Sequence, residues 1–565
     1  MKLITTQKVN CQDCHRCLRS CPVKAIGIEA GQARVLENKC VLCGRCVVEC
    51  PQQAKVVEDE VEFIKQAILS GRQVVLSLAP SFVAAFNEYR PDDFFAILAG
   101  LGFSAVEETA VGAELISRVY ASMMANSKVP VISACCPVVV RIIKKYYPGL
   151  THYLAPVVSP MLAHAQLIKR RFGQNAMVVF AGPCIGKIAE KDEANSAVDA
   201  VITFAKLRKW LTEANNPIGS EVQKENLLPA SSGARFYPIA GGILKSFTKS
   251  EYTDSDVISV DGLEECVEAF AALMAGDISP RFVEALACRG GCINGPVSGR
   301  TNCSPAKRMS IIQFAACGAS SALTEYIDEA DFARKHVADQ VSEFQPQESE
   351  IRQVLYQTGK YFQADEKNCG ACGFNSCREK AIAVCQGLTS VETCVPYMRT
   401  KAESFANIIV DNSLNGIIVV DKNLAIQEFN PAAERIFKLH KENVKNRALA
   451  EFMDSSDVAL AAQTGRKVIN RRVELVADEI IVSQMIIPVV EHGLIIIVMT
   501  DISGLEKNSR ELEQVKRQTV EKATEIINKQ MQVAQEIAGL LGETTAETKA
   551  ALFELIGLVK PKEDN

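Results

Sequence analysis

The sequence lacks the marks of a membrane, secreted or nucleic-acid-binding protein. No apolar run reaches the ~18 residues that a membrane-spanning helix requires, and Met1 to Gln7 lacks the apolar core of a signal peptide. The net charge is −5 and the pI is near 5.9, whereas a general nucleic-acid binder carries a strongly basic face. We therefore expect a cytoplasmic protein with no membrane span and no nucleic-acid partner.

Cysteine is the residue that the sequence has in excess. The 565 residues predict roughly three or four domains, and 48% apolar with 23% charged residues is an ordinary globular composition. The 21 cysteines are an odd number on a chain without a secretion signal, which argues against a disulfide framework. Cysteine at this density in a reducing compartment indicates metal binding.

The first cysteines form two copies of one pattern. Each copy reads C-x2-C-x2-C-x3-C-P, the spacing of a two-cluster bacterial ferredoxin, in which the fourth cysteine ligates the cluster of the other copy. We therefore expect two 4Fe-4S clusters, one held by Cys11, Cys14, Cys17 and Cys50 and the other by Cys40, Cys43, Cys46 and Cys21. Two zinc knuckles are the alternative.

A later group consists of Cys369, Cys372, Cys377 and Cys394. Three of them lie on a Gly-rich loop and the fourth returns after a helix-like run, an arrangement that suits another 4Fe-4S cluster. The group resembles the small four-cysteine iron–sulfur module of several anaerobic redox proteins, and zinc is the alternative. Cys385 lies in the helical run, where core packing is the expected role.

Three more segments are recognised by the residues that surround their cysteines. They are Ser133 to Pro137 with Cys135 and Cys136, Gly182 to Glu190 with Cys184, and Glu284 to Gly295 with Cys288 and Cys292. In this order behind a double ferredoxin, they resemble the catalytic domain of iron-only (FeFe) hydrogenases, whose patterns are TSCCP, MPCxxKxxE and ExMACxxGC. The resemblance spans roughly residues 1 to 340.

The resemblance implies a cofactor and a role for each matching residue. A fourth 4Fe-4S cluster would be bound by Cys136, Cys184, Cys288 and Cys292, in keeping with the preference of thiolates for such clusters. Cys292 would also bridge to a diiron subsite that carries CO, cyanide and a dithiolate amine. Lys187 would donate a charge-assisted hydrogen bond to a cyanide, Glu190 would support Lys187, and Cys135 would pass protons to the amine. A packed core thiol is the alternative for Cys135.

The sequence departs from the family at positions around the ligands. The replaced positions are Gly182 and Leu286 (methionines in the family), Gly295-Pro296-Val297-Ser298 (in place of GGGQP) and Ala155 (near the expected serine). Of the carboxylates expected between Gly112 and Ala125, only Glu114 is present, and Glu107 and Glu108 are the other acids nearby. Because outer-shell residues tune a metal site, we expect slow turnover and a proton route through these acids or water.

The rest of the chain predicts a multidomain α/β and α+β architecture. Residues 74–340 alternate β-rich runs at Val74 to Leu78, Val129 to Ser133 and Ala176 to Ala181 with helical segments, and residues 341–353 read as a linker. The expected domains are a two-cluster ferredoxin over 1–60, a hydrogenase H-cluster domain over 61–345, a 4Fe-4S module over 354–400, a PAS domain over 401–504 and a C-terminal helical signalling segment over 505–565.

From about Phe405 the sequence resembles a PAS sensory domain. The expected elements are strands ending at Asp421, starting at Ala425, and over Arg472 to Val476, Glu479 to Ile487 and Gly493 to Thr500, with a helix begun at Asn430-Pro431. His440 and His492 are haem-ligand candidates by residue type only.

The C-terminal segment reads as a long helix. Apolar residues and one threonine recur every seven positions at Leu505, Leu512, Thr519, Ile526, Val533 and Leu540, which predicts a weak coiled-coil seam. An amphipathic helix lying on its own domain is the alternative. We expect a homodimer through the PAS domain and this helix, and, because no kinase, cyclase or DNA-binding motif follows, a signalling kinase or phosphatase on a separate chain.

Three functions follow from these readings. The first is a hydrogen sensor of low turnover. The replaced residues around the cluster ligands, the PAS domain on the same chain and the resemblance to the sensory subgroup of iron-only hydrogenases favour this hypothesis. The second is a catalytic hydrogenase that exchanges electrons with ferredoxin or another redox protein. The third is a non-catalytic iron–sulfur assembly protein, although Lys187 and Glu190 would have no role there. Cys266, Cys303 and Cys317 have no assigned role beyond packing.

Overall fold

The computed structural model describes residues 3–58, 60–193, 196–214, 230–247, 253, 255–299, 304–318, 329–475 and 480–541. The chain divides into two compact units, Met1–Tyr397 and Met398–Asn565. Within the described ranges, no helix is both long and apolar enough to cross a membrane.

The first unit begins with a small domain of two antiparallel strand pairs. β1 (Ile4–Thr6) pairs with β4 (Lys55–Val57), and β2 (Ile26–Glu29) pairs with β3 (Gln32–Val35). The two cysteine copies fold alike, because three pairs of equivalent residues adopt left-handed backbone conformations: Asp13 and Leu42, His15 and Gly44, Lys24 and Gln53. A short helix follows the loop of each copy, α1 (Arg16–Ser20) and α2 (Arg45–Val48).

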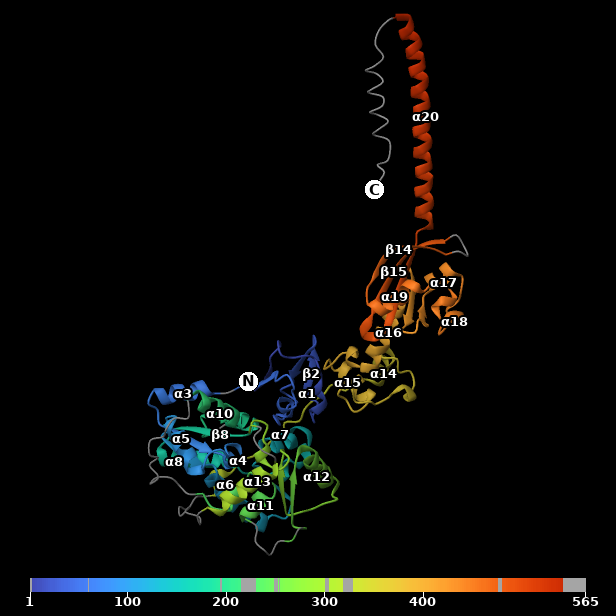
Figure 1. Cartoon of the computed structure of the whole chain (residues 1–565). Coiled ribbons are helices and arrows are strands. Elements are labelled where there is room, and N and C mark those ends of the chain that lie inside the picture. Colours follow the sequence, from blue (N-terminus) through green and yellow to red (C-terminus); the bar gives the residue numbers. More distant parts are fainter. Residues whose placement is uncertain are drawn as a thin grey trace. The chain divides into compact units, whose positions relative to one another are not determined.

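Two parallel sheets form the core of the next part. The larger has the order β6 (Ala105–Glu108), β5 (Val74–Leu78), β8 (Met177–Gly182) and β9 (Ala200–Thr203), and every residue of these strands is buried. Burial on both faces explains why the strands read as continuous apolar runs. Helices α8 (Pro160–Phe172) and α10 (Phe204–Glu213) both contact β8 (Figure 1).

The smaller parallel sheet has the order β10 (Val257–Asp261), β11 (Phe282–Leu286) and β7 (Val131–Ile132). β7 is shorter than the predicted strand over Val129 to Ser133. The remaining helices of this part are α3 (Val61–Leu69), α4 (Phe82–Ala85), α5 (Pro91–Gly100), α6 (Ala110–Asn126), α7 (Pro137–Tyr146), α9 (Gly186–Lys191), α11 (Gly242–Phe247), α12 (Leu263–Ala275) and α13 (Ser304–Ala316).

The last part of the first unit is a small helical module. Residues 334–347 contain no helix or strand. The linker predicted over 341–353 is therefore wrong from residue 348 on, because Gln347 and Glu350 form a capping box that begins α14 (Glu348–Gln357), and α15 (Cys377–Cys385) follows. Only a few side chains, among them Ile351, Leu355 and Ala381, form the core of this helix pair.

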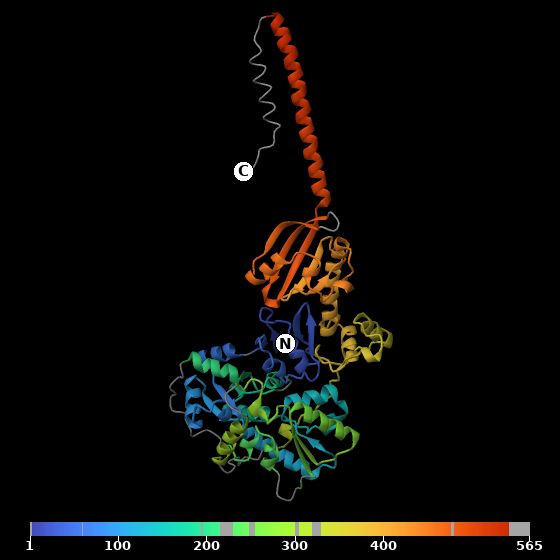
Figure 2. The ribbon, with the colours of Figure 1, turned by 45° about the vertical axis from the view of Figure 1, so that its right-hand side comes forward.

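The second unit contains a five-stranded antiparallel sheet (Figure 2). Its order is β13 (Ile426–Phe429), β12 (Gly416–Asp421), β16 (Leu494–Asp501), β15 (Ile480–Val489) and β14 (Val468–Leu475). Helices α17 (Pro431–Phe437), α18 (Lys441–Val444) and α19 (Ser456–Thr464) connect β13 to β14. Asn430 caps α17, because its side chain accepts the N–H of Ala433 at 2.9 Å. The predicted strands are present, although Val476 and Glu479 lie outside the described residues.

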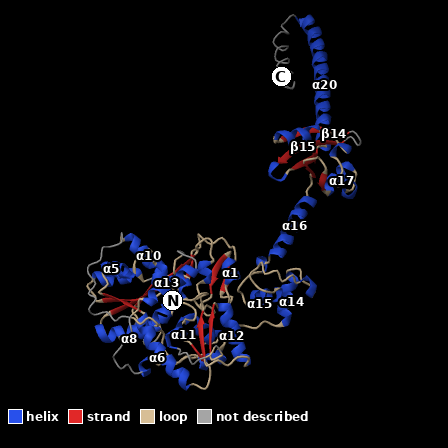
Figure 3. Cartoon of the chain, turned by 60° about the horizontal axis from the view of Figure 1, so that its bottom comes forward, coloured by secondary structure: helices blue, strands red, loops and turns tan. Residues whose placement is uncertain are grey.

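Two helices flank this sheet in sequence, α16 (Val395–Asp411) and α20 (Ser503–Leu541) (Figure 3). The side chains of Leu505, Leu512 and Ile526 on α20 are 71%, 57% and 60% exposed. The alternative of a helix lying on its own domain is therefore wrong for these positions. The coiled coil stays a prediction, and the side chain of Leu540 and residues 542–565 lie outside the described part.

Candidate metal centre

The predicted ligands of the hydrogenase-like segment sit on loops that follow parallel strands. Cys136 follows β7 and caps α7, Cys184 follows β8, and Cys288 and Cys292 follow β11. In α/β proteins the carboxyl ends of parallel strands are where ligands bind. Loops from both sheets therefore contribute to one site.

The four thiols lie close enough to affect one another's ionisation. Burial, and after it the thiols of Cys136 and Cys184, raise the pKa of Cys292 to about 12. Burial and then the thiols of Cys292, Cys184 and Cys136 raise the pKa of Cys288. Such thiols stay neutral in water-poor surroundings, but a bound metal deprotonates a coordinating thiol. This donor set fits an iron–sulfur cluster.

A cavity of about 90 Å³ lies beside these thiols. Its wall is mostly apolar, with Pro160, Met161, Phe180 and Pro183 among the lining residues. The sulfur and polar groups that reach it belong to Ser81, Thr109, Cys135, Cys184, Lys187, Tyr237 and Cys292. An apolar pocket with a few convergent polar groups is the usual form of a small-ligand site.

Lys187 carries a buried charge into this cavity. Its Nζ donates to Glu190 Oε2 at 2.6 Å and to the carbonyl of Cys135 at 3.2 Å. Burial alone would lower the pKa of Lys187, but Glu190 and the nearby thiols more than offset it, and the pKa lies above its ordinary value. The ammonium is therefore present in the cavity at neutral pH, as a donor to an anionic ligand would need to be.

Cys135 also lines the cavity. Burial raises the pKa of its thiol well above the ordinary value, and Cys136, Cys292 and Glu284 raise it further, whereas Lys187 lowers it. Its neighbour Ala134 donates its N–H to the hydroxyl of Tyr120 at 3.0 Å. The thiol lies at the wall of the cavity, and the proton transfer that the resemblance implies for it stays a prediction.

The acids expected near Cys135 are all engaged in ion pairs. Glu107 Oε1 lies 2.6 Å from Arg171 Nη1, Glu108 lies 2.6 Å from Arg235, and Glu114 lies 3.0 Å from Arg118. A carboxyl that does raise the pKa of Cys135 is Glu284 on β11. Burial raises the pKa of Glu284 to about 7. Glu284 is the first residue of the third motif segment, but no role was predicted for it from the sequence. Its position as an acid among apolar residues was the signal that could have predicted one.

The positions at which the sequence departs from the family are closely packed or buried. A side chain on Gly182 would meet the ring of Phe180, which lies within 2.5 Å of an added Cβ, so Phe180 lines the cavity where a methionine was expected. A Cβ on Gly295 would approach the carbonyl of Pro183 to 2.5 Å. Leu286 and Ala155 are buried.

The structure brings Cys21 together with three cysteines of the other copy. One small cavity is lined by Cys21, Cys40, Cys43 and Cys46. Burial raises the pKa of Cys46, and the thiols of Cys43, Cys40 and Cys21 also raise it. This is the grouping that the exchange of fourth ligands requires.

The other grouping is seen in part. Burial is the main cause of a raised pKa at Cys17, and the thiols of Cys11 and Cys14 contribute. Cys50 matches Cys21 in its backbone contact, because Ala54 donates its N–H to the Cys50 sulfur at 3.3 Å and Ala25 donates to the Cys21 sulfur at 3.2 Å. Hydrogen bonds to ligand sulfurs are one means of setting a cluster's potential.

The second ferredoxin-like loop packs against the hydrogenase-like site. An added Cβ on Gly44 would lie 2.5 Å from Pro296 and 2.8 Å from Ile185, the residue after Cys184. Cys43 is among the thiols that raise the pKa of Cys288. Arg45 of the same loop pairs with Glu264 on α12. The two thiol groups are therefore neighbours.

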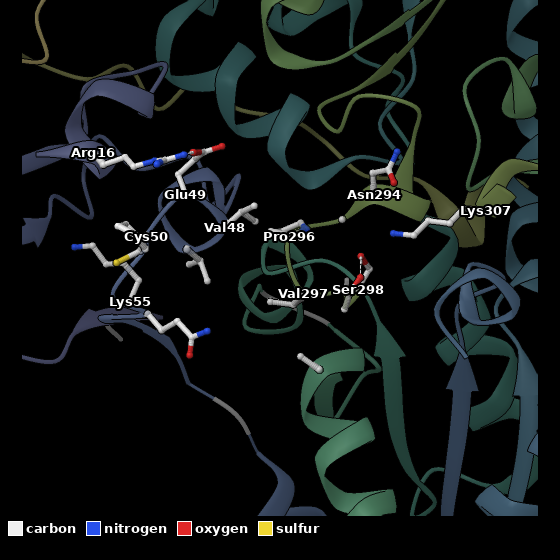
Figure 4. Close-up of a pocket in the computed structure, with 16 residues that line it drawn as sticks. Arg16, Val48, Glu49, Cys50, Lys55, Asn294, Pro296, Val297, Ser298 and Lys307 are labelled. Atoms are coloured by element: carbon white, nitrogen blue, oxygen red, sulfur yellow. Dashed lines mark hydrogen bonds and ion pairs between the residues drawn. The ribbon is translucent and has the colours of Figure 1, made fainter. Parts of the chain in front are cut away.

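A cleft of about 950 Å³ separates the ferredoxin-like domain from the loop after Cys292 (Figure 4). Arg16, Glu49 and Cys50 lie on one wall, and Pro296 and Lys307 lie on the other. Arg16 and Glu49 form an ion pair of 2.9 Å. The cleft gives solvent access to the side of the domain where Cys50 lies.

The cysteines of the helical module gather around two lysines. Lys360 Nζ lies 3.7 Å from the sulfur of Cys394. Burial lowers the pKa of Lys380, against which the thiols of Cys394, Cys372 and Cys377 act. The fourth predicted ligand, Cys369, is exposed.

The module packs on α1 of the ferredoxin-like domain. Arg19 donates to the carbonyls of Ala371 at 3.3 Å and Cys14 at 3.0 Å, and Lys24 donates to the carbonyl of Gly373 at 2.7 Å. The three cysteine-rich parts thus form a continuous series within the first unit.

The remaining candidates lie apart from these groups or outside the described residues. Cys266 is buried and its Sγ lies 3.6 Å from the carbonyl of Leu286. Cys385 is partly exposed and Cys317 is exposed, whereas Cys303 lies outside the described residues. His440 and His492 are both exposed, which disfavours haem ligation. In the described ranges no three His, Cys, Asp or Glu side chains converge on a single-ion site; a cubane does not need this, because each thiolate binds a separate iron.

Family models match four segments of the chain. Residues 72–296 match the C-terminal domain of the iron only hydrogenase large subunit, and residues 10–60 match a 4Fe-4S dicluster domain. Residues 365–396 match an Fe-S cluster model, and residues 407–502 match the PAS fold. The chain thus contains an iron-only hydrogenase domain, a 4Fe-4S ferredoxin domain and a C-terminal PAS domain, as the sequence motifs predicted.

Curated relatives are hydrogenases of low identity. Iron hydrogenase 1 of Clostridium pasteurianum is 24% identical over 307 residues, 43% of this chain and 53% of the relative. The NADP-reducing hydrogenase subunit HndD of Solidesulfovibrio fructosivorans is 24% identical over 366 residues, 50% of this chain and 62% of the relative. The chain therefore spans less than two thirds of the length of these relatives.

One solved structure with a similar part is a FeFe-hydrogenase HydA1 variant from Chlamydomonas reinhardtii. It is 18% identical with a TM-score of 0.38, and the match covers 50% of this chain and 100% of the HydA1 chain. The PAS domain of nitrogen regulation protein NR(II) from Vibrio parahaemolyticus is 18% identical with a TM-score of 0.16, covering 17% of this chain and 97% of that one.

Proposed function

We propose that the chain is a hydrogen-sensing iron-only hydrogenase that interconverts H2 with two protons and two electrons slowly and relays its redox state toward the PAS domain. The observation that carries the proposal is the cavity in which Cys184 and Cys292 meet Cys135 and the charged Lys187. A cavity of this composition within a hydrogenase domain fits the H-cluster.

Each residue of the cavity would have a distinct task. Cys136, Cys184, Cys288 and Cys292 would hold the 4Fe-4S part, and Cys292 would also hold the diiron subsite with its CO, cyanide and dithiolate amine. That subsite, when bound, supplies reversible cleavage of H2. Lys187 holds an ammonium toward an anionic ligand, Glu190 fixes Lys187 in place, and Cys135 moves a proton between the cavity and the surrounding side chains.

Electrons would travel along the series of cysteine groups. Cys288 neighbours Cys43, and the module packs on α1 beside Cys14. With four 4Fe-4S clusters in place, the series would run from the H-cluster through both ferredoxin clusters to the module. The sequence leads directly from the module's Cys394 into α16 and then the PAS domain. We therefore assign the module the role of redox reporter.

Partners follow from the two ends of this series. A ferredoxin or another redox protein would exchange electrons through the ferredoxin domain, where the cleft beside Cys50 gives access. A kinase or phosphatase on a separate chain would receive the signal, in the cytoplasm, and the exposed apolar residues of α20 would support a homodimer.

A catalytic, ferredoxin-linked hydrogenase is the second candidate, favoured by the complete series of cysteine groups. An assembly protein without the diiron subsite would leave the buried Lys187–Glu190 pair without a purpose.

Infrared spectroscopy and turnover distinguish these functions. Protein matured with the family's assembly enzymes should show CO and cyanide bands, and its H2 turnover should lie orders of magnitude below that of catalytic hydrogenases. Turnover equal to theirs would favour the catalytic candidate. Absence of the bands after maturation would favour the assembly protein.

A further inference from the structure

A chain of buried polar side chains begins at the cavity that Cys135 lines. Thr109, which also lines the cavity, has its Oγ1 2.7 Å from the Oγ of Ser77. The same Ser77 oxygen lies 2.8 Å from His164 Nδ1. On the far side of the ring, His164 Nε2 lies 3.2 Å from Glu107 Oε2.

Three of these four residues lie on three elements, and the fourth lies between β6 and α6. Ser77 lies on β5, Glu107 on β6, Thr109 between β6 and α6, and His164 on α8. All four are at most 4% exposed. Gly112 allows this close packing, because an added Cβ there would lie 2.7 Å from the Cβ of His164.

Glu107 orients the histidine. Arg171, whose side chain is 22% exposed, donates to Glu107 Oε1 at 2.6 Å. Burial raises the pKa of Glu107, but His164 and Arg171 outweigh this, and the pKa lies below its ordinary value. The ionised carboxylate accepts the proton of His164 Nε2, which leaves Nδ1 to accept the hydroxyl proton of Ser77. Each of these side chains therefore donates its hydrogen bond to the next one, in the order Thr109, Ser77, His164 and Glu107.

We propose that Thr109, Ser77 and His164 conduct protons between the cavity and Glu107, in place of the acidic relay that the sequence lacks. The proposal rests on the proposed hydrogenase function. A proton from the cavity binds Thr109 Oγ1 as Thr109 passes its own proton to Ser77. Ser77 passes its proton to His164 Nδ1, and the Nε2 proton moves to Glu107. Each hydroxyl ends with one proton, no electron moves, and His164 ends with its proton on Nδ1 instead of Nε2, so the ring returns to its first tautomer before the next transfer. The Glu107 side chain is fully buried, and its proton leaves on the side of the partly exposed Arg171, where solvent is nearest.

A second chain of hydroxyl groups begins at Tyr237 in the same cavity, but it is less suited to proton transfer. Tyr237 OH lies 2.8 Å from Ser117 Oγ, which lies 2.6 Å from Ser246 Oγ. Burial raises the pKa of Tyr237 far above its ordinary value. The His164 route contains an imidazole, whose two ring nitrogens let it accept a proton from Ser77 and donate one to Glu107. The low proton affinity of Glu107 makes the last transfer slow, in keeping with low turnover.

The hydroxyl of Thr109 allows a matched test. Thr109→Val removes the hydroxyl and keeps the shape, whereas Thr109→Ser keeps the hydroxyl. In matured protein we expect Thr109→Val to slow H/D exchange between H2 and D2O about tenfold or more. The infrared change that follows a pH jump without H2 should slow equally, while band positions and iron content stay those of the parent. Thr109→Ser should keep parental rates within about twofold.

Equal rates in Thr109→Val and the parent, or equal losses in Thr109→Val and Thr109→Ser, would overturn the route. If Thr109→Val does not assemble, Glu107→Gln tests the far end of the chain. Its control is Asp331→Asn, which breaks the 2.8 Å ion pair between Asp331 and Arg170. Arg170 lies on α8 next to Arg171, the partner of Glu107. Glu107→Gln should slow both measurements and Asp331→Asn should not; equal rates in both variants would overturn the route. A parent without CO bands or exchange would instead contradict the proposed function.

Discussion

The hydrogenase-like site and the C-terminal module differ in how their cysteines are held. Cys136, Cys184 and Cys292 come from distant loops that two parallel sheets position, the larger of which is buried throughout. The module's cysteines lie within one short segment, Cys369 to Cys394, over a core of a few side chains, and Cys369 is exposed. Long-range packing makes a rigid site suited to chemistry, whereas local ligation at a small module makes a site whose surroundings can respond to its charge.

The largest expected effect separates the two sites by a pair of serine variants. Cys292→Ser should abolish the CO and cyanide infrared bands and leave the ferredoxin clusters, because this thiolate alone would join the diiron subsite to the protein. Cys394→Ser should remove the module cluster, measured as iron content and by electron paramagnetic resonance, and leave the bands. Bands that survive in Cys292→Ser would refute the assignment.

Cys135 should matter for rate and not for assembly. Cys135→Ala removes the one cavity-lining thiol that is not a predicted cluster ligand, and general acid–base catalysis is worth about 10² to 10⁴ in rate. We expect turnover to fall by this factor while the infrared spectrum stays nearly parental. Glu114→Gln should lose less, because Glu114 pairs with Arg118 and water can replace it. Parental turnover in Cys135→Ala would make this residue a packing thiol.

Glu284 should give the rigid site its pH dependence. The pKa of Glu284 is raised to about 7 by burial, so the carboxyl is neutral below this pH and ionised above it. The ionised form raises the pKa of the Cys135 thiol and makes it a weaker proton donor. Hydrogen production should therefore rise as pH falls through about 7. In Glu284→Gln this step should vanish from the pH–rate profile; an unchanged profile would assign the step to another group.

The smallest expected effect concerns the module. Lys360 Nζ lies 3.7 Å from the Cys394 sulfur, and its charge would stabilise the reduced form of a cluster held there. A buried hydrogen bond to a charged group is worth about 1.5 kcal/mol or more, which is about 60 mV for a one-electron couple. Because Lys360 is partly exposed, Lys360→Gln should lower the cluster's midpoint potential by about this amount or less. Redox titration followed by electron paramagnetic resonance measures the shift. Arg352→Gln, which breaks a surface pair with Glu348, is the control and should leave the potential unchanged.

The sequence predicted what depends on local spacing and left out what depends on long-range contact. The exchange of Cys21 into the group of Cys40 follows from a repeated motif. The chain Thr109–Ser77–His164 does not, because its members are far apart in sequence and meet only through the packing of β5, β6 and α8. The Phe180 ring occupies the space beside Gly182, a contact between two residues of one strand that the family motif alone does not predict.

The same distinction applies to charges and exposed faces. Glu107, Glu108 and Glu114 are the acids nearest to Cys135 in sequence, yet each pairs with an arginine brought in by the fold. Glu284 is distant in sequence and nevertheless affects the thiol. The heptad pattern predicted which residues form the apolar face of α20. The sequence did not predict that this face is exposed, because its exposure depends on the direction of α20 after β16.

Reduction of the clusters by H2 alone tests the central claim most directly. Matured parent protein and Cys292→Ser, both oxidised and free of other reductants, are placed under H2, and the module and ferredoxin clusters are followed by electron paramagnetic resonance. Signals of reduced clusters, including the module cluster, should develop in the parent within minutes and stay absent in Cys292→Ser. Clusters that remain oxidised in the parent, or that become reduced equally in both proteins, would contradict a protein that senses hydrogen at this site.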